Sequence, residues 1–338
     1  MPSQPVTSPG EGLLPMEAKS APELPEGAGW QFEPKWDGFR CIAAREGETV
    51  ALWSKAGKPL GRYFPEVVAA LAALPAERFV LDGELIIPEG ATLSFAALQM
   101  RLHPSASRIA KLSAATPAEL MLFDHLGDPA APLSERRAAL EAFVAANPSP
   151  TLRLSPATEQ RATAQGWLDT VGGALDGVVA KRCDEPYRPG ERAMVKVKRL
   201  RTADCVVGGF RYASEGGEVG SLLLGLYDGE GRLNHVGFTS NMPKDERAAL
   251  EALVEAPGFT GDAPGGPSRW ATERSAEWQP LRPELVVEVR YDHVTAARFR
   301  HGTSFLRWRP DKAPRQCTYD QIEEEARPAV VAAALKGR

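Results

Sequence analysis

The stretch that decides the fold is EPKWDGFR, residues 33–40. It places Lys35, Asp37 and Arg40 around Gly38, with two aromatic residues between them. In an extended segment Lys35 and Asp37 share one face, because side chains alternate with a period of two. Gly38 lets a ligand approach the backbone closely, and the Arg40 guanidinium offers paired hydrogen bonds to an oxygen-rich ligand. A type I′ hairpin turn on Asp37-Gly38 is the alternative, since Asp-Gly is favoured in that turn.

A lysine in such a segment is a candidate nucleophile. The amine of a lysine is a poor nucleophile while it is protonated, and its unperturbed pKa is about 10.4. Neighbouring cations and partial desolvation lower the pKa of a lysine and free the amine. The segment therefore predicts either a charged surface turn or a nucleophilic Lys35.

Composition limits the classes of protein to consider. A chain of 338 residues, 43% apolar and 25% charged, is typical of about two globular domains. No apolar run approaches the roughly 20 residues that span a bilayer, and the N-terminus has no signal-peptide pattern. The four cysteines are scattered without a CxxC pair, which argues against a zinc cluster or a disulfide framework. The scattered cysteines therefore indicate a reducing cytoplasm, and nothing in the sequence suggests membrane insertion or export.

Positive charge is concentrated in two segments although the net charge is −4. Residues 181–201 hold eight bases and three acids, and residues 298–315 hold six bases and one acid. Local basic patches matter more for phosphate binding than the overall sum. Solvated charge on two surfaces is the alternative interpretation.

Residues 1–201 are predicted to contain both helices and strands after an N-terminal leader. Residues 1–29 contain six prolines and little periodicity, which indicates an extended or partly disordered leader. Residues 30–201 alternate helical patterns with apolar strand-like runs, without a regular βαβ rhythm. The predicted helices cover 64–74, 94–102, 134–146 and 159–171, and the predicted strands cover 50–54, 79–87, 120–126 and 176–181. This favours an α+β domain of mostly antiparallel sheets.

Residues 202–338 predict a second domain. Apolar strands are separated by glycine-rich turns, and DGEG at 228–231 is a hairpin signal. Helical patterns cover about 244–255 and about 319–335. Strands with one inserted helix fit a small barrel such as the OB-fold, followed by a C-terminal helix.

Further charged motifs follow the opening one. Asp-Gly recurs in DGE (82–84) and in DGVVAK (176–181). In VKVK (195–198) the two lysines share one strand face, which suits phosphate binding better than a core strand. FLRWRPDK (305–312) places two arginines on one face, directly before an Asp-Lys pair.

In this order, the motifs KxDGxR, DGE, FD, DGVVxK, KxK and RxDK resemble those of the covalent nucleotidyltransferases, across about residues 14–317. That superfamily includes ATP-dependent DNA ligases, RNA ligases and mRNA capping enzymes. EPKWDGFR, RYFPE (62–66) and RWRPDK are most similar to the compact bacterial ligases of the ligase C and ligase D type. The resemblance implies a nucleotidyltransferase (adenylation) domain of antiparallel sheets with helices, followed by an OB-fold domain.

The resemblance also implies an activity, namely sealing of 3′-OH/5′-phosphate nicks in duplex DNA during DNA repair. The reaction would pass through lysyl-AMP and DNA-adenylate intermediates and use ATP and Mg²⁺, which Mn²⁺ can replace. ATP is favoured over NAD because the zinc-finger cysteine set of NAD-dependent ligases is missing. We expect a monomer that binds nicked DNA, with other DNA-repair proteins as candidate partners. An RNA ligase or capping-type enzyme is the alternative, and a non-catalytic module of the same fold is a weaker one.

Residue roles around the nucleotide are carried over from the resemblance. Lys35 would attack the α-phosphate of ATP, and Arg40 would bind the ribose. Glu84 would contact the ribose or a metal ion. Phe123 would stack on adenine, with an ordinary core phenylalanine as the alternative, and Glu33 would meet the adenine edge.

Arg62 would hold a phosphate, with a helix-start salt bridge as the alternative. Asp37 would either position the lysine or stabilise a turn. Asp176 departs from the family pattern, where glutamate is usual, and would bind Mg²⁺ directly or through a water.

The remaining roles concern the phosphates. The resemblance gives one group of lysines the task of neutralising the α-phosphate and the departing pyrophosphate: Lys181, Lys196 and Lys198. It gives the last motif the task of orienting the leaving pyrophosphate, which requires the second domain to close during adenylation and to move away afterwards. The residues of that motif are Arg309, Asp311 and Lys312.

Overall fold

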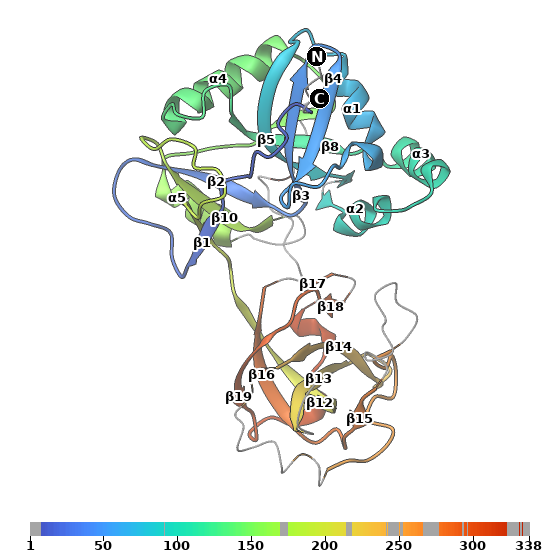
Figure 1. Ribbon diagram of the computed structural model, residues 1–338. Coiled ribbons are helices and arrows are strands. Elements are labelled where there is room, and N and C mark those ends of the chain that lie inside the picture. Colours follow the sequence, from blue (N-terminus) through green and yellow to red (C-terminus); the bar gives the residue numbers. More distant parts are fainter. Residues whose placement is uncertain are drawn as a thin grey trace. The chain divides into compact units, whose positions relative to one another are not determined.

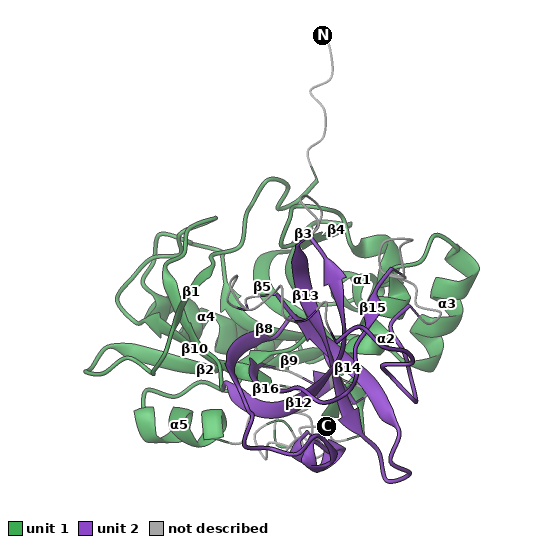
Figure 2. Cartoon of the chain, turned by 90° about the horizontal axis from the view of Figure 1, so that it is seen from below, with its two compact units in different colours: residues 1–199, 326–338 green, residues 200–325 purple. Residues whose placement is uncertain are grey.

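The structure is a computed structural model that describes residues 8–90, 92–169, 175–213, 218–240, 242, 250, 253–265, 277–292, 294–295, 297–322, 331 and 333. The chain forms two compact units (Figures 1 and 2). The first contains residues 1–199 and 326–338, and the second contains residues 200–325. No helix in the described ranges is long and apolar enough to cross a membrane.

The first unit contains two main sheets (Figure 1). One has five strands in the order β4-β3-β5-β8-β9, and the other has four in the order β1-β11-β10-β2. The strand bounds are β1 Ala18–Ala21, β2 Trp30–Trp36, β3 Phe39–Glu46, β4 Thr49–Ser54, β5 Arg78–Ile86, β8 Glu119–His125, β9 Leu152–Leu154, β10 Leu175–Arg182 and β11 Met194–Val197. Two short strands, β6 (Pro88–Glu89) and β7 (Thr92–Leu93), pair with each other. Pairing is antiparallel except for β8 with β9 and β1 with β11.

Within the described residues, five α-helices of this unit lie around the sheets. Their bounds are α1 Pro65–Ala72, α2 Phe95–Arg101, α3 Ala106–Ala115, α4 Leu133–Ala146 and α5 Arg161–Asp169. A short 3₁₀ helix, η1 (Gly61–Tyr63), precedes α1. Ser94 caps α2 by accepting a hydrogen bond from the amide of Ala97, as expected of an N-cap serine. All four predicted helices of this unit are confirmed within a few residues, whereas α3 was missed.

The unit has its largest core on one side of the five-stranded sheet. There Leu81 and Leu85 of β5 pack with Val67 and Leu71 of α1 and with Leu140 of α4. Smaller clusters join the two sheets, because Ile42 of β3 packs with Met194 of β11 and Met121 of β8 packs with Leu175 of β10. Strands covered on both faces show continuous burial instead of alternation, and β8 is the clearest example.

Strands β2 and β3 follow each other in the chain but belong to different sheets. β2 pairs with β10, whereas β3 pairs with β4 and β5. The type I′ hairpin alternative on Asp37-Gly38 is therefore wrong, and these residues carry the chain from one sheet to the other. A Cβ on Gly38 would lie 2.2 Å from the carbonyl oxygen of Leu85, so glycine is required there by the close approach of β5.

The described part of the predicted leader packs on the first unit. Strand β1 pairs with β11, and the side chains of Met16 and Leu24 are buried in the first unit. β1 is an edge strand, where one side needs no partner and nearby prolines are tolerated. Proline content alone could not separate an edge strand from a disordered segment.

The second unit is a small antiparallel β-barrel of the OB-fold type. Its main sheet has the order β14-β13-β12-β16-β19, with β15 beside β12. The bounds are β12 Arg201–Tyr212, β13 Val219–Tyr227, β14 Leu233–Thr239, β15 Gln279–Pro280, β16 Val286–Tyr291, β17 Val294–Thr295, β18 Arg298–Phe299 and β19 Ser304–Trp308. Two 3₁₀ turns follow, η2 (Pro314–Gln316) and η3 (Tyr319–Gln321). The predicted turn at 228–231 joins β13 and β14.

The two helices predicted for this region lie largely outside the described residues. The described start of the second one, at 319–321, is a 3₁₀ turn. Val331 near the C-terminus is buried in the first unit with Trp36 and Ile86. Val331 therefore packs in the first unit, although the sequence analysis placed it with residues 202–338 in the second domain. A helical pattern alone does not reveal which core a segment packs against.

Candidate active site

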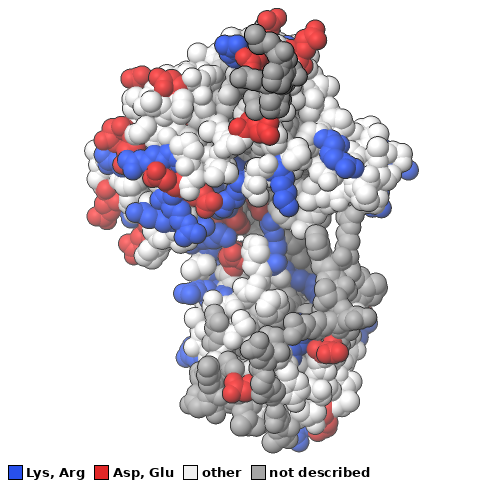
Figure 3. Space-filling model, in the orientation of Figure 1, with Lys and Arg blue, Asp and Glu red and all other residues white. Residues whose placement is uncertain are grey.

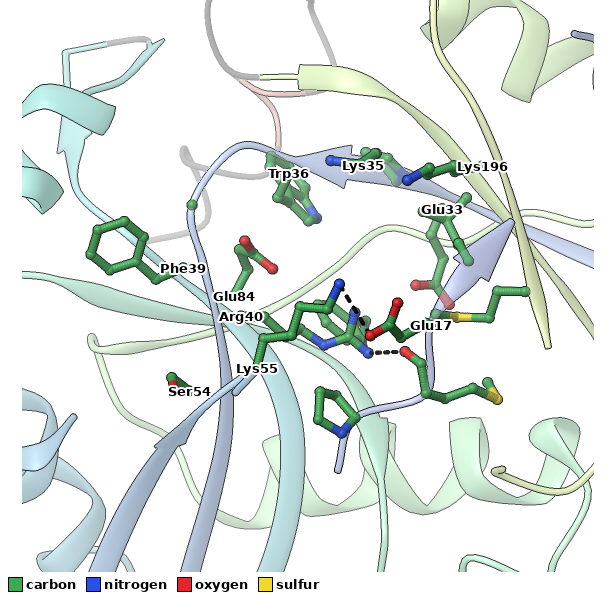
Figure 4. A pocket seen from close by; sticks show the side chains of 18 of the residues that line it. Glu17, Glu33, Lys35, Trp36, Phe39, Arg40, Ser54, Lys55, Glu84 and Lys196 are labelled. Atoms are coloured by element: carbon green, nitrogen blue, oxygen red, sulfur yellow. Dashed lines mark hydrogen bonds and ion pairs between the residues drawn. The ribbon is translucent and has the colours of Figure 1, made fainter. Parts of the chain in front are cut away.

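A cavity of about 520 Å³ opens in the first unit between its two sheets (Figure 4). This volume is in the range typical of small-molecule sites. Residues predicted from the sequence line it from both sheets: Glu33, Lys35, Arg40, Glu84, Phe123, Lys181 and Lys196. Lys35 and Lys196 lie near each other on neighbouring parts of one wall in Figure 4, with Arg40 and Glu84 on the strands of the other sheet. The motifs spread along the chain therefore meet in one cavity.

Lys35 is held in place by a carboxylate. Its Nζ lies 2.7 Å from Oδ2 of Asp176, and the Nζ of Lys198 lies 3.3 Å from the same oxygen. Asp176 is on β10, beside β2, and its side chain is only 8% exposed. Burial, together with the cations of Lys35 and Lys198, lowers the pKa of Lys196 below its usual value. Among the residues that the structure describes, no carboxylate lies within ion-pair distance of Lys196. Positive charge thus exceeds negative charge at this wall.

Lys181 and Glu33 form a buried ion pair beside Phe123. The Nζ of Lys181 lies 2.9 Å from Oε2 of Glu33 and donates a hydrogen bond of 3.3 Å to the carbonyl of Phe123. Glu33 Oε1 accepts a second hydrogen bond, from Gln31. The ring of Phe123 has the Lys181 ammonium 4.8 Å and the Arg40 guanidinium 4.6 Å from its centroid. Phe123 thus lines the cavity among cations, which differs from an ordinary core phenylalanine.

Arg40 makes its strongest contacts with a residue that the sequence analysis did not single out. Its guanidinium donates two hydrogen bonds of 2.6 Å to the buried carboxylate of Asp82. The Tyr187 hydroxyl donates to Asp82 as well, and the Met16 amide donates to Tyr187. Burial alone would lower the pKa of Arg40, but the Asp82 carboxylate raises it above its ordinary value. Asp82 is the first residue of the DGE motif, so the motif could have indicated it. No local sequence motif indicates Tyr187.

The predicted metal site involves Glu84 and Asp176. Burial raises the pKa of Glu84 to about 7, although Arg40 and Lys35 act in the opposite direction. A bound cation would favour the ionised carboxylate. In the described part of the chain no group of three or more His, Cys, Asp or Glu side chains could hold a metal. Mg²⁺ is commonly bound by one or two carboxylates together with substrate phosphates. Glu84 lines the cavity and offers one such carboxylate, whereas Asp176 is not among the lining residues and pairs with Lys35 and Lys198.

Arg62 and Lys198 do not line the cavity. Arg62 lies in η1 and donates a hydrogen bond of 3.0 Å to the carbonyl of Pro104, while its guanidinium stacks on Tyr63. The salt bridge considered for Arg62 is not formed with any described residue. Lys55 and Glu17, which the sequence analysis missed, form an ion pair of 3.2 Å at the cavity wall (Figure 4).

In the second unit, two cations that were predicted from the sequence both pair with the carboxylate of Asp204. Arg309 Nη1 lies 2.9 Å from Oδ1 of Asp204, and Lys312 Nζ lies 2.7 Å from Oδ2 of the same residue. Arg309 also donates to Asp311, and this bonding lowers the pKa of Asp311 to about 2. Asp204 was not predicted because it is far from the motif in the sequence.

Ion pairs offset part of the positive charge in both basic segments. In Figure 3, Lys and Arg side chains gather on the face of the first unit where β1 and β10 lie. Arg188 and Arg192, from the first basic segment, have side chains 44% and 76% exposed. In the second segment Arg307 pairs with Glu288 at 2.6 Å, and Arg309 and Lys312 pair with Asp204. In the first segment Lys181 pairs with Glu33 and Lys198 pairs with Asp176, so the sequence count of excess charge overstates both patches.

Comparisons with known proteins agree with this site. Residues 15–198 match the model of the ATP dependent DNA ligase domain, and residues 215–312 match that of the ATP dependent DNA ligase C terminal region. The chain is 47% identical to DNA ligase C2 of Mycolicibacterium smegmatis, across 92% of this chain and 94% of that protein. It is 32% identical to the multifunctional non-homologous end joining protein LigD of Mycobacterium bovis, across 84% of this chain and 37% of that protein.

A solved structure supports the fold. A Lig E DNA ligase superposes with a TM-score of 0.54 at 20% identity, covering 87% of this chain and 99% of that chain. The adenylation domain and the barrel predicted from the motifs are thus the two matched family regions. The RNA ligase and capping-enzyme alternatives gain no support from these relatives. The chain belongs to the ATP-dependent DNA ligases.

Proposed function

We propose that Lys35 is the nucleophile that becomes adenylated by ATP. The carrying observation is that Lys35 lines the cavity with its Nζ 2.7 Å from Oδ2 of Asp176, which is not itself among the lining residues. After the ammonium has passed a proton to the Asp176 carboxylate, the amine would attack the α-phosphorus, forming an N–P bond as the bond to the pyrophosphate oxygen breaks and a second proton is lost from the nitrogen to solvent. Asp176 holds the amine toward the cavity, and fixed positioning of reactants is a large part of enzymatic rate acceleration.

The cations of this wall support the transfer. Lys196 and Lys198 lie on or next to β11, with Lys35 close by on β2, so that charge developing on the phosphates meets preorganised ammonium groups. Lys181 would join them by leaving its ion pair with Glu33. Glu33 would then meet the edge of the adenine, and Phe123 would stack on its ring.

Arg40 and Glu84 are proposed to bind the ribose from the opposite sheet. The Asp82 carboxylate fixes the guanidinium of Arg40 by two hydrogen bonds and thereby limits the positions it can take. Glu84 and Asp176 would hold Mg²⁺, with Mn²⁺ as a substitute. The ion would supply charge neutralisation at the phosphates.

Arg309, Asp311 and Lys312 are proposed to orient the departing pyrophosphate. Arg62 is proposed to contact a phosphate, which would require it to exchange its hydrogen bond to Pro104. After adenylation, AMP would pass to the 5′-phosphate of a nick, and the 3′-OH would then displace AMP. We further propose a monomer acting on nicked duplex DNA in the bacterial cytoplasm at the nucleoid, with other repair proteins as partners.

The test of the nucleophile is mass spectrometry after incubation with ATP and Mg²⁺. The wild-type chain should gain one AMP, whereas Lys35→Ala and Lys35→Arg should gain none, because a guanidinium stays protonated. Lys58→Ala is a matched control, since it removes a lysine of the same unit that does not line the cavity. AMP attachment to Lys35→Ala at the wild-type level would refute the proposal. Labelled GTP in place of ATP distinguishes a capping-type reaction.

A further inference from the structure

We propose that Asp204 is a positioning residue for adenylation, which holds Arg309 and Lys312 at a fixed spacing so that both charges reach the pyrophosphate together. The inference rests on the proposed role of these two cations. Each binds a different oxygen of one carboxylate, Arg309 at Oδ1 and Lys312 at Oδ2. The carboxylate thus sets the distance between two long, flexible side chains that would otherwise sample many rotamers.

The backbone of Asp204 is itself fixed. The Asp204 amide donates to Oε1 of Gln321 at 2.9 Å, and Nε2 of Gln321 donates to the Asp204 carbonyl at 3.0 Å. On its other side β12 pairs with β16, while the register of β12 with β13 begins at Val206. The amide of Gln321 therefore replaces the missing neighbouring strand at this point. Both backbone groups of Asp204 are satisfied, as buried polar groups require.

A row of charges surrounds this carboxylate. Asp204, Glu288 and Arg307 are register partners across β12, β16 and β19. Two carboxylates directly opposite each other destabilise a sheet unless cations compensate them. Here Arg307 pairs with Glu288 at 2.6 Å, while Arg309 reaches Asp204 at 2.9 Å and Glu288 only at 4.0 Å. The two carboxylates thus serve different cations, although they share one face of the barrel.

Arg309 and Lys312 can bind a phosphate while they contact Asp204, because that contact does not use all of their N–H donors. An ammonium has three N–H donors, and the contact to Asp204 uses one of them at Lys312. Side-chain exposure is 22% for Lys312 and 19% for Arg309, compared with 11% for Asp204. The cations lie between a largely buried anchor and the solvent, so an incoming phosphate can meet both without displacing Asp204.

The experiment measures two reactions for the same variants, namely self-adenylation with ATP and sealing of a pre-adenylated nick. Asp204→Asn keeps the shape of the side chain and removes its charge. We expect self-adenylation to slow about tenfold or more, since hydrogen bonds to charged groups are the stronger ones. Sealing of the pre-adenylated nick should stay within about twofold of wild type, because no pyrophosphate leaves in that step. The control Glu288→Gln removes the neighbouring carboxylate and should leave self-adenylation within about twofold.

A double-mutant cycle separates positioning from simple stabilisation. If Asp204 acts through Lys312, Asp204→Asn should add little to the loss caused by Lys312→Ala, whereas independent effects would multiply. Thermal unfolding of each variant accompanies the cycle. If Asp204→Asn no longer unfolds cooperatively, Asp204→Glu retains the charge but moves it, and it should still slow self-adenylation while sparing sealing.

The outcomes distinguish the inference from the function on which it rests. Wild-type or faster self-adenylation by Asp204→Asn, with Lys312→Ala impaired, overturns the positioning role alone. Equal losses in both reactions also overturn it, since they would indicate general damage to the barrel. Unchanged self-adenylation by both Arg309→Ala and Lys312→Ala overturns the proposed pyrophosphate role and the inference together.

Discussion

Gly38→Ala should cripple adenylation although it adds only one methyl group. In the structure a Cβ at this position would lie 2.2 Å from the Leu85 carbonyl oxygen and 2.7 Å from Cγ of Glu84. Side-chain Cβ atoms essentially never approach closer than 3.0 Å, so the gap to Leu85 must widen by at least 0.8 Å (3.0 minus 2.2). The obstacle is the backbone of β5, whose Leu85 and Ile86 are fully buried. The strand cannot yield as a flexible side chain would.

The displacement can be converted into an expected effect. Glu84 and Arg40 line the cavity on the same sheet, and Lys35 lies three residues before Gly38. A shift of about 1 Å between reacting groups can cost about 100-fold in rate. Overpacking of a filled core costs about 1–3 kcal/mol, and for a unit of this size each kcal/mol lowers the melting temperature by about 2–4 °C. We therefore expect a folded protein that melts several degrees lower and self-adenylates about 100-fold more slowly.

The assay is the rate of AMP attachment at saturating ATP, measured beside thermal unfolding. Gly166→Ala is the matched control, because Gly166 lies in helix α5 of the same unit and a Cβ there meets nothing within 4 Å. This control should unfold at the same or a higher temperature, since alanine favours helices over glycine by about 1 kcal/mol. Its adenylation rate should equal that of wild type. A Gly38→Ala protein that adenylates within about threefold of wild type would refute the argument from close packing.

Three further predictions follow from other parts of the molecule. Asp311→Ala should slow self-adenylation but spare sealing of a pre-adenylated nick; equal losses in both assays would contradict the proposed division of labour. Burial, with the nearby Arg298 and Arg211, lowers the pKa of His235 from 6.5 to about 3. Between pH 6.5 and about pH 3 the unfolded chain is therefore protonated at this histidine while the folded chain is not. The stability of the fold falls as the pH drops through this range. Between about pH 7 and about pH 5, the free energy of unfolding should fall by about 2 kcal/mol less in His235→Gln than in wild type, as measured by denaturant titration. Equal losses in the two proteins would contradict the lowered pKa of His235. DNA binding through phosphates should weaken with salt, each contact adding about −0.9 to the log–log slope, and should ignore base sequence; a flat salt response in a nicked-duplex titration would exclude it.

The sequence predicted most of the charged residues that line the cavity, and Phe123, because they belong to short motifs that can be recognised without the structure. Lys35, Arg40, Glu84, Phe123 and Lys196 are all in the cavity wall, and none required knowledge of long-range pairing. The strand and helix patterns of the first unit were predictable for the same reason. Hydrophobic periodicity is a local property, and it survives in elements packed on one well-defined core.

The sequence did not predict side-chain contacts between residues that lie far apart along the chain. Tyr187 lies 105 residues from Asp82, and Asp204 lies 105 residues from Arg309. Neither Tyr187 nor Asp204 has a local pattern that separates it from an ordinary strand or loop residue. Strand β1 was missed for a related reason, since its stability comes from pairing with β11 and not from its own apolar content.

The connection between β2 and β3 behaves as a spacer of fixed length. Most connections between strands lie on the surface and tolerate added residues. This one comprises residues 37 and 38 and carries the chain between two sheets that are each held by other strands. An inserted residue would have to bulge against β5, or shift one strand by one position and turn its alternate side chains to the opposite face. The segment from Lys35 to Arg40 therefore sets the spacing between the two walls of the cavity, and inserting or deleting a residue there would alter the enzyme more than most substitutions within it.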